Sequence, residues 1–333
     1  MPSSDVPLVS RRGLITGLAA APALTLAAVP GEAQAAGIDA TIAATQAALK
    51  DARGTKLVIL GTGAGPVPGS ARHMTAHILV SKGAAYVLDC GLGVTRQFAR
   101  TGIPWRALKA IFITHHHPDH NIEYGPLLVL GWVGGMQQSV RAYGPPPLAQ
   151  MTADYFRSAK TTIDFWAEDF HIPALAPIET HELPQAGPVM QDENVKVTSV
   201  LVQHPPVTPA YGYRFDFQDR SIAFSGDTVG LEAVAAMAKG ADMLVHEAID
   251  MPAIEAYMKA QIAPARFDAA MAHMRADHTP TEEVGRIAHE AGVKTLVLSH
   301  LAPGENVSDE RWHQAAAKSF KGEIIVARDL MVI

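Results

Sequence analysis

Four side chains able to bind a metal ion fall within six residues of this 333-residue chain. They are His115, His117, Asp119 and His120. These residues follow the apolar run 111–113, so the chain turns at this point and presents them at the edge of a sheet. Imidazole and carboxylate groups suit zinc, iron or manganese, and no cysteine is needed. His115 and His117 can point to one side and hold one ion, while Asp119 and His120 can hold a second beyond Pro118.

Three more candidate ligands follow later predicted strands. They are His204 after residues 195–202, Asp227 after residues 221–225, and His300 after residues 295–299. Strand ends are where α/β architectures gather their sites. A carboxylate such as that of Asp227 can bridge two ions held about 3.5–4 Å apart, as in two-metal hydrolases. The sequence therefore predicts a bridged site for two divalent ions, with zinc favoured over manganese or iron.

The elements that must position these residues occur in two successive halves, with no low-complexity linker between them. Predicted strands at 56–60, 77–80, 85–89 and 107–114 precede the histidine run, and further strands and helices follow it. The economical arrangement is an α/β fold, a four-layer αββα sandwich of two mixed β-sheets flanked by helices. With 48% hydrophobic residues, the chain has enough apolar material for such a core.

The first 35 residues are typical of an export signal. Arg11 and Arg12 precede a weakly apolar stretch, and Ala33-Gln34-Ala35 offers a small-x-small cleavage site. Paired arginines indicate the twin-arginine route. The apolar stretch is short and interrupted by prolines, so no stable membrane anchor is expected. We therefore expect a signal peptide at 1–35, a hydrolase domain at 36–333, and a periplasmic or secreted location.

The histidine motif, the strand-end ligands and the two-half layout resemble the metallo-β-lactamase superfamily over nearly all of residues 36–333. The resemblance is nearest to the ribonuclease Z-like branch, which includes a group of exported bacterial arylsulfatases. Four further motifs carry it: Gly61-Thr62-Gly63, Leu88-Asp89-Cys90-Gly91, Val245-His246-Glu247-Ala248 and Asp277-His278-Thr279.

The resemblance implies a role for each site residue. One ion would take His115, His117 and His204, and the other would take Asp119, His120 and His300, with Asp227 between them. Asp119 would also orient the nucleophile, His278 would assist the leaving group, and Glu247 would orient His278. From its surroundings in the sequence, His278 has a second interpretation, as the residue that introduces a helix near Thr281.

Such a site predicts hydrolysis, because bound zinc lowers the pKa of water from 15.7 to about 7. We expect a metal-bound hydroxide to attack a small ester, with an aryl sulfate or phosphate ester favoured. A lactone or β-lactam ring is the alternative substrate. A metal-binding or redox protein without hydrolytic activity is the third interpretation.

The charge balance argues against a nucleic-acid partner. The net charge is -6, and lysines and arginines are scattered, whereas a nucleic-acid binder normally needs a basic face. The tRNA-processing members of the branch carry a long arm rich in glycine and proline, but the segment after Gly144 and Pro145–Pro147 predicts an ordinary helix. We therefore expect a small-molecule substrate and no nucleic acid, and a homodimer stays open.

Aromatic residues between 155 and 170 either line the site or pack that helix against the sheet.

Overall fold

The computed structural model describes residues 30–51, 53–65, 70–230 and 232–333. Residues 1–29 of the expected signal peptide lie outside this described part. The chain divides into a unit at 1–39 and a unit at 40–333, and helix α1 (Pro30–Lys50) crosses the boundary. The candidate site lies wholly in the second unit. Within the described ranges, no helix is both long enough and apolar enough to cross a bilayer.

The first sheet, as far as the chain is described, has six strands in the order β1-β2-β3-β4-β5-β6. Its strands are β1 (Lys56–Gly61), β2 (Ala76–Ser81), β3 (Ala84–Leu88), β4 (Leu108–Phe112), β5 (Val140–Gly144) and β6 (Ile178–Glu182). Strands β1 to β3 pair antiparallel, and β3 to β6 pair parallel. Every residue of β3 is buried, as expected for a strand covered on both faces.

The second sheet has seven strands among the described residues, in the order β13-β12-β11-β10-β9-β8-β7. They are β7 (Gly187–Gln191), β8 (Val195–His204), β9 (Val207–Phe217), β10 (Ser221–Phe224), β11 (Met243–Ile249), β12 (Thr295–Ala302) and β13 (Glu323–Val326). Strands β7 to β10 pair antiparallel and β10 to β13 pair parallel, so this sheet is also mixed.

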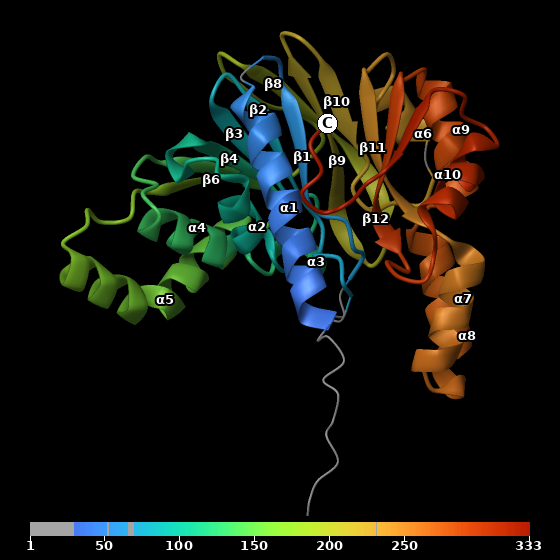
Figure 1. Ribbon diagram of the computed structural model, residues 1–333, viewed down its shortest axis with the longest axis horizontal. Coiled ribbons are helices and arrows are strands. Elements are labelled where there is room, and N and C mark those ends of the chain that lie inside the picture. Colours follow the sequence, from blue (N-terminus) through green and yellow to red (C-terminus); the bar gives the residue numbers. More distant parts are fainter. Residues whose placement is uncertain (1–29, 52, 66–69, 231) are drawn as a thin grey trace, which may run out of the picture. The chain divides into compact units, whose positions relative to one another are not determined.

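Helices cover the outer face of each sheet (Figure 1). On the first sheet lie α2 (Val94–Thr101), α4 (Tyr124–Val133) and α5 (Leu148–Phe170), with a 3-10 turn at Trp105–Ala107. On the second lie α6 (Glu232–Met237), α9 (Thr281–Ala291) and α10 (Asp309–Ala317). A separate apolar core lies between the sheets. The expected four-layer αββα sandwich is confirmed.

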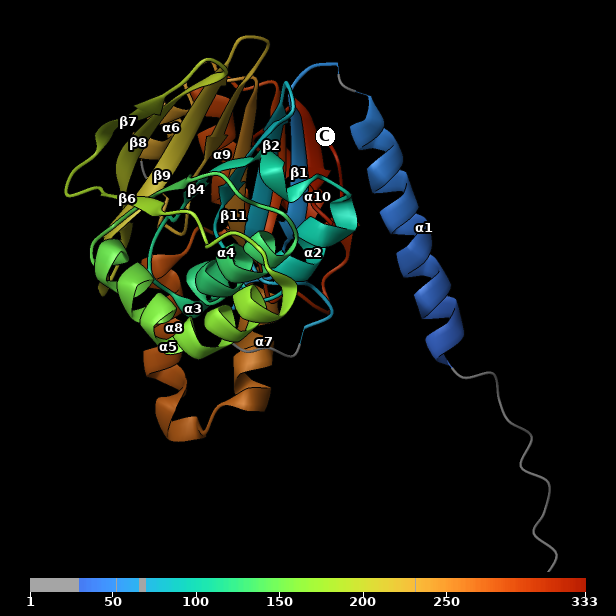
Figure 2. The same cartoon turned by 90° about the vertical axis from the view of Figure 1, so that its left-hand side faces the viewer.

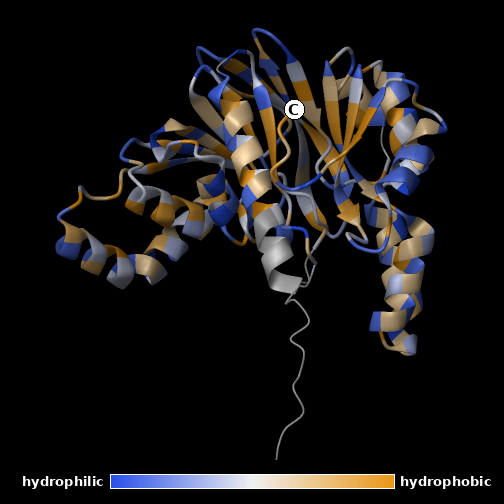
Figure 3. Ribbon diagram, in the orientation of Figure 1, coloured by the Kyte–Doolittle hydropathy of each residue, from blue (hydrophilic) through white to orange (hydrophobic). Residues whose placement is uncertain are grey.

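Aromatic rings hold the two sheets together. Phe112 at the end of β4 stacks on Tyr143 with 5.2 Å between ring centroids, and it meets Phe215 of the other sheet edge-on at 5.0 Å. Offset and edge-to-face pairs of this kind are the favoured arrangements for aromatic rings. Figure 3 shows the strands of both sheets coloured predominantly hydrophobic. This packing fixes the end of β4 against the second sheet, next to the histidine run.

Two helical regions extend further than the helices that the sequence predicts at 148–157 and 253–260. Helices α7 (Met251–Gln261) and α8 (Pro264–Asp277) form a hairpin that projects beyond the strands (Figure 2), although only the first was expected. Helix α5 continues to Phe170. Within it Phe156 packs against the core, while Phe165 and Phe170 are 64% and 57% exposed. The expected packing role therefore fits Phe156, but not the rings near the end of the helix.

Candidate metal centre

The histidine run occupies a tight turn after β4. Its last part forms the short helix α3 (Pro118–Asn121), which has proline at its first position. Proline suits this position because its fixed φ matches the helix and the N–H that it lacks would have no helical partner. The turn buries both Asp119 and His120, at 5% and 1% exposure. A local turn thus places a carboxylate and an imidazole in the interior.

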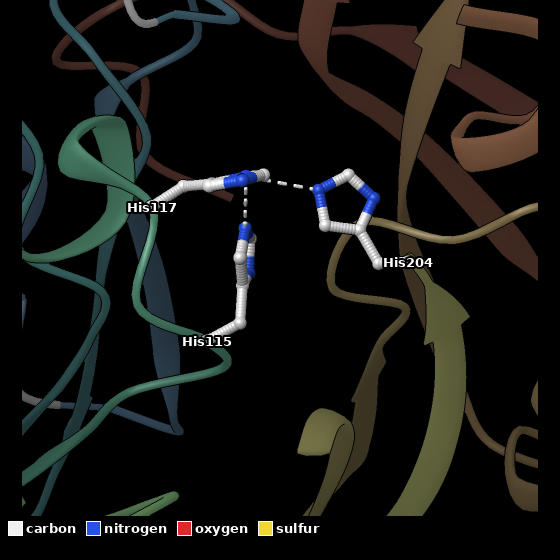
Figure 4. A group of neighbouring side chains, drawn as sticks. All are labelled: His115, His117 and His204. Carbon is white, nitrogen blue, oxygen red and sulfur yellow. Dashed lines mark hydrogen bonds between the residues drawn. The ribbon is translucent and has the colours of Figure 1, made fainter. Parts of the chain in front are cut away.

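The first group of candidate ligands comprises three histidines from two sheets (Figure 4). His115 and His117 follow β4, whereas His204 ends β8. Nδ1 of His117 lies 3.0 Å from Nε2 of His115 and 3.0 Å from Nε2 of His204. Three ring nitrogens therefore converge on one point.

The second group comprises Asp119, His120, Asp227 and His300, whose ligand atoms all lie within 4.8 Å of one another. Oδ2 of Asp227 lies 3.2 Å from Nε2 of His120 and 3.0 Å from Nε2 of His300. Oδ2 of Asp119 lies 3.3 Å from Nε2 of His300. The same oxygen of Asp227 is 3.9 Å from Nε2 of both His115 and His204. Asp227 thus stands between the two groups, and its role as a bridging carboxylate stays a prediction.

Hydrogen bonds on the outer side hold these rings in place. Oδ2 of Asp89 accepts from Nδ1 of His120 at 2.8 Å, and the Asp277 carbonyl accepts from Nδ1 of His204 at 3.0 Å. Such bonds fix the tautomer of a ligand histidine and leave its Nε2 lone pair facing the centre. Asp89 belongs to one of the motifs that carry the family resemblance. Nothing in the sequence indicated the Asp277 contact, because a backbone carbonyl carries no residue signature.

Unusual backbone conformations bring the chain close to the centre. Gly226 has φ +62°, and a Cβ there would meet the Tyr211 carbonyl oxygen at 2.5 Å, so this turn before Asp227 requires glycine. The N–H of Gly65 donates to Oδ2 of Asp119 at 2.8 Å. Asp89 and His300 are non-glycine residues with φ of 61° and 45°. Left-handed residues of this kind cost about 1–3 kcal/mol each and cluster at functional sites.

Burial and charge divide the histidines into two kinds. Burial lowers the pKa of His115 well below its usual range and that of His117 to about 4, so both rings are neutral near pH 7. Burial also disfavours a charge on His300, but the attraction of Asp227 outweighs this and raises its pKa to about 10. Burial would raise the pKa of Asp227, yet His120 and His300 hold it well below its usual range. The buried carboxylates are therefore ionised and require positive charge beside them.

Both groups fit divalent metal ions. Nitrogen ligands about 2.0–2.1 Å from a tetrahedral zinc lie roughly 3.3 Å apart, close to the 3.0 Å spacings around His117. Neutral rings offer lone pairs, and a cation would supply the charge that Asp119 and Asp227 require. All seven candidate ligands therefore fall into two adjacent groups suited to such ions.

The two remaining candidate residues, Glu247 and His278, lie next to the candidate metal ligands. Nδ1 of His278 donates to Oε2 of Glu247 at 2.7 Å, and the His278 ring centroid is 5.1 Å from that of His204. Oε1 of Glu247 accepts from the N–H of Thr228 at 2.6 Å, which fixes the carboxylate. His116 instead lies 2.8 Å from the Pro145 carbonyl through its Nε2. It belongs to neither group of candidate ligands.

Two mixed sheets with a histidine and aspartate centre at their strand ends define the metallo-β-lactamase class of fold. Residues 85–301 match the family model described as the beta-lactamase superfamily domain, and the chain belongs to this metallo-β-lactamase superfamily. Proteins of this fold usually bind two divalent metals, often zinc. The chain is accordingly a metal-dependent hydrolase of the superfamily, as expected.

Its relatives include ribonuclease Z. The chain is 31% identical over 280 residues to Ribonuclease Z of Mycobacterium bovis, which covers 83% of this chain and 96% of the relative. It is 32% identical over 282 residues to Ribonuclease Z of Mycobacterium sp. (strain KMS), which covers 83% and 94%. The crystal structure of human tRNase Z, short form, shares the fold with a TM-score of 0.60 at 24% identity, covering 84% of this chain and 98% of that one.

These relatives overturn the expected substrate and partner. Both Mycobacterium proteins, similar over nearly their whole length, are named as ribonucleases, so the expected hydrolysis of a small ester without a nucleic-acid partner is wrong. The lactone, β-lactam and redox alternatives are set aside with it. A net charge of -6 averages over the whole surface, whereas a phosphodiester responds to the local field of bound cations. The total charge therefore could not exclude a polyanionic substrate.

We predict that Asp89→Asn weakens metal binding by roughly 10–100-fold, because an amide has one acceptor oxygen, whereas Asp89 accepts from the N–H of Thr114 with Oδ1 and from His120 with Oδ2. Asparagine tolerates the left-handed backbone of Asp89, so the fold is retained. Metal affinity measured by competition with a chromogenic chelator checks this. The matched control is Asp154→Asn, on the exposed side of α5, which leaves the affinity unchanged. Equal affinities for all three proteins would contradict the role of Asp89.

Proposed function

We propose that this protein hydrolyses a phosphodiester bond of RNA at a centre holding two zinc ions. In this proposal one ion is held by His115, His117 and His204, the other by Asp119, His120 and His300, and Asp227 lies between them. The observation that carries the choice of substrate is the 31% identity to a ribonuclease over 96% of that protein's length. Bound at this centre, the ions would acidify a water molecule and stabilise charge on the phosphate oxygens.

The protein's own groups would handle orientation and the proton. Oδ2 of Asp119 faces the centre, fixed by the N–H of Gly65, and would orient the attacking water. In its protonated form His278 donates its Nδ1–H to Glu247 and would give its Nε2 proton to the leaving oxygen, which leaves the neutral ring hydrogen-bonded to Glu247. Glu247 contacts His278 rather than the reacting atoms, so it is a positioning residue.

The direct test is cleavage of a fluorophore-labelled tRNA precursor by zinc-loaded protein, with and without chelator. We expect cleavage that chelator abolishes. His278→Ala should lower kcat by roughly 10²–10⁴-fold, the usual contribution of a general acid, and retain both ions. The matched control is His313→Ala, on an exposed helical face, which should cleave at the normal rate.

The outcomes separate the parts of the proposal. Absence of RNA cleavage by the fully zinc-loaded wild type would refute the substrate. Loss of metal from the His278→Ala variant would show instead that His278 is a ligand.

The pH dependence tests the role of Glu247. Burial disfavours a protonated His278, but the attraction and hydrogen bond of Glu247 outweigh it and raise the pKa of His278 above its usual range. An acid is required, so kcat should fall as pH rises through that raised pKa. In Glu247→Gln the attraction is lost, and the fall should move to lower pH. Glu193→Gln, at an exposed position, serves as the control; an unshifted profile in Glu247→Gln would contradict the positioning role.

We further propose that residues 1–35 direct export through the twin-arginine route and that residues 36–333 form the hydrolase domain. Arg11 and Arg12 before a weakly apolar stretch support this. The enzyme would then meet its RNA outside the cytoplasm. The resemblance to the exported arylsulfatases within the branch stays a prediction. It carries no conclusion about the substrate.

Replacing Arg11 and Arg12 together by lysine should leave the protein in the cytoplasm, because the route recognises paired arginines. Cell fractionation with an antibody against the protein measures this. Arg157→Lys, on exposed α5, should be exported normally. Unchanged export of the double lysine variant would rule out the twin-arginine route.

A further inference from the structure

A cavity of about 420 Å³ adjoins the candidate metal centre and takes no part in holding the ions. Its volume lies within the range of roughly 300–1,000 Å³ that is typical of small-ligand clefts. Met74 and Leu92 provide an apolar side, and His73, Arg96 and Glu123 provide polar groups. This combination suits a ligand with one flat apolar part and one anionic part.

The cavity meets the centre on the side of Asp119. Ala64 lies in its wall, and the next residue, Gly65, donates to Asp119. His278 contacts Glu247 and His204 instead. A polynucleotide whose phosphate lies at the centre can therefore place one flank near His278 and the other flank in the cavity.

One polar wall of the cavity is rigid. Oδ2 of Asp329 accepts from both the backbone N–H and Nδ1 of His73, at 2.7 and 2.8 Å. The ring edge lies against Gly93, where an added Cβ would meet Cδ2 of His73 at 2.1 Å. The His73 side chain is therefore held in a fixed position in the cavity wall.

The Arg96 side chain carries a positive charge in the cavity wall and is available to bind a ligand. Its exposed guanidinium makes no hydrogen bond or ion pair with any described residue. The Glu123 carboxylate already accepts from the N–H groups of Gly93 and Thr95, at 2.9 and 3.1 Å. Arg72, in contrast, is held by the carbonyls of Gly304 and Ala327, at 2.8 and 3.0 Å.

We propose that this cavity binds the nucleotide next to the scissile phosphodiester. Arg96 binds the phosphate of that nucleotide, and Leu92 and Met74 contact its base. This assignment rests on the proposed RNA hydrolysis and adds to it a subsite that determines how the strand is seated.

The test compares charge changes inside and outside the cavity. Arg96→Ala should raise KM for the RNA roughly tenfold with less than a twofold change in kcat, since one charge-assisted contact is lost. The slope of log KM against log salt should fall by about 0.7, the value for one phosphate contact on a single strand. Arg106→Ala removes the same charge from an exposed position outside the cavity and should change neither. Equal effects of both variants would overturn the proposal.

A second pair tests the apolar side without removing a cation. Leu92→Glu places a carboxylate where the nucleotide should lie, and Leu130→Glu makes the same change on α4; the two leucines are 41% and 51% exposed. Only Leu92→Glu should raise KM, again by roughly tenfold. An equal KM for both variants would overturn the proposal.

Binding of adenosine 5′-monophosphate, measured by calorimetry on zinc-loaded protein, separates the cavity from the catalytic function. Weaker binding by Arg96→Ala and Leu92→Glu, with normal binding by both controls, supports the cavity even if no RNA is cleaved. Equal binding by all variants overturns the cavity proposal even in an active nuclease.

Discussion

Two ionised carboxylates, those of Asp119 and Asp227, lie buried at the strand ends of both sheets, and this constraint governs the rest of the site. Buried charges are costly unless paired, so positive charge must stand beside them. His120 and His300 supply it as imidazolium ions when protonated, as their raised pKa values show. Divalent ions would supply it with more charge at the same place. The buried carboxylates therefore need a positive charge beside them, whether it comes from protonated histidines or from bound ions.

The fold meets this requirement by joining ligands that are distant in sequence. His115 and His117 come from the first sheet, His204 and Asp227 from the second, and the aromatic contact of Phe112 with the second sheet fixes the distance between them. Each half alone would leave its ligands incomplete. A core substitution far from the centre can therefore weaken metal binding, because close-packed interiors transmit displacement.

The proposed RNA substrate would be bound through features that act on different scales. Ions at the centre would provide local positive charge for a phosphodiester even though the whole chain carries a net charge of -6. In the cavity beside Asp119, Arg96 would provide a permanent positive charge for a phosphate of the strand, and Leu92 would provide an apolar surface for a base. Affinity for an RNA strand would then depend on a few well-placed groups rather than on a basic face. This is why the overall composition predicted the wrong class of partner.

The sequence by itself determined the fold class and indicated seven candidate metal ligands, because ligand types at strand ends have a recognisable spacing, whereas Glu247 and His278 were indicated by the family resemblance. Helix α4 and strands β5 to β7 were not predicted, since their short segments carry weak periodicity and are held in place by neighbouring elements. Only the tertiary structure decided that the Asp277 carbonyl holds His204 and that a cavity opens beside Asp119. These features depend on atoms brought together from distant parts of the chain, and a carbonyl or an empty volume leaves no mark in the order of residues.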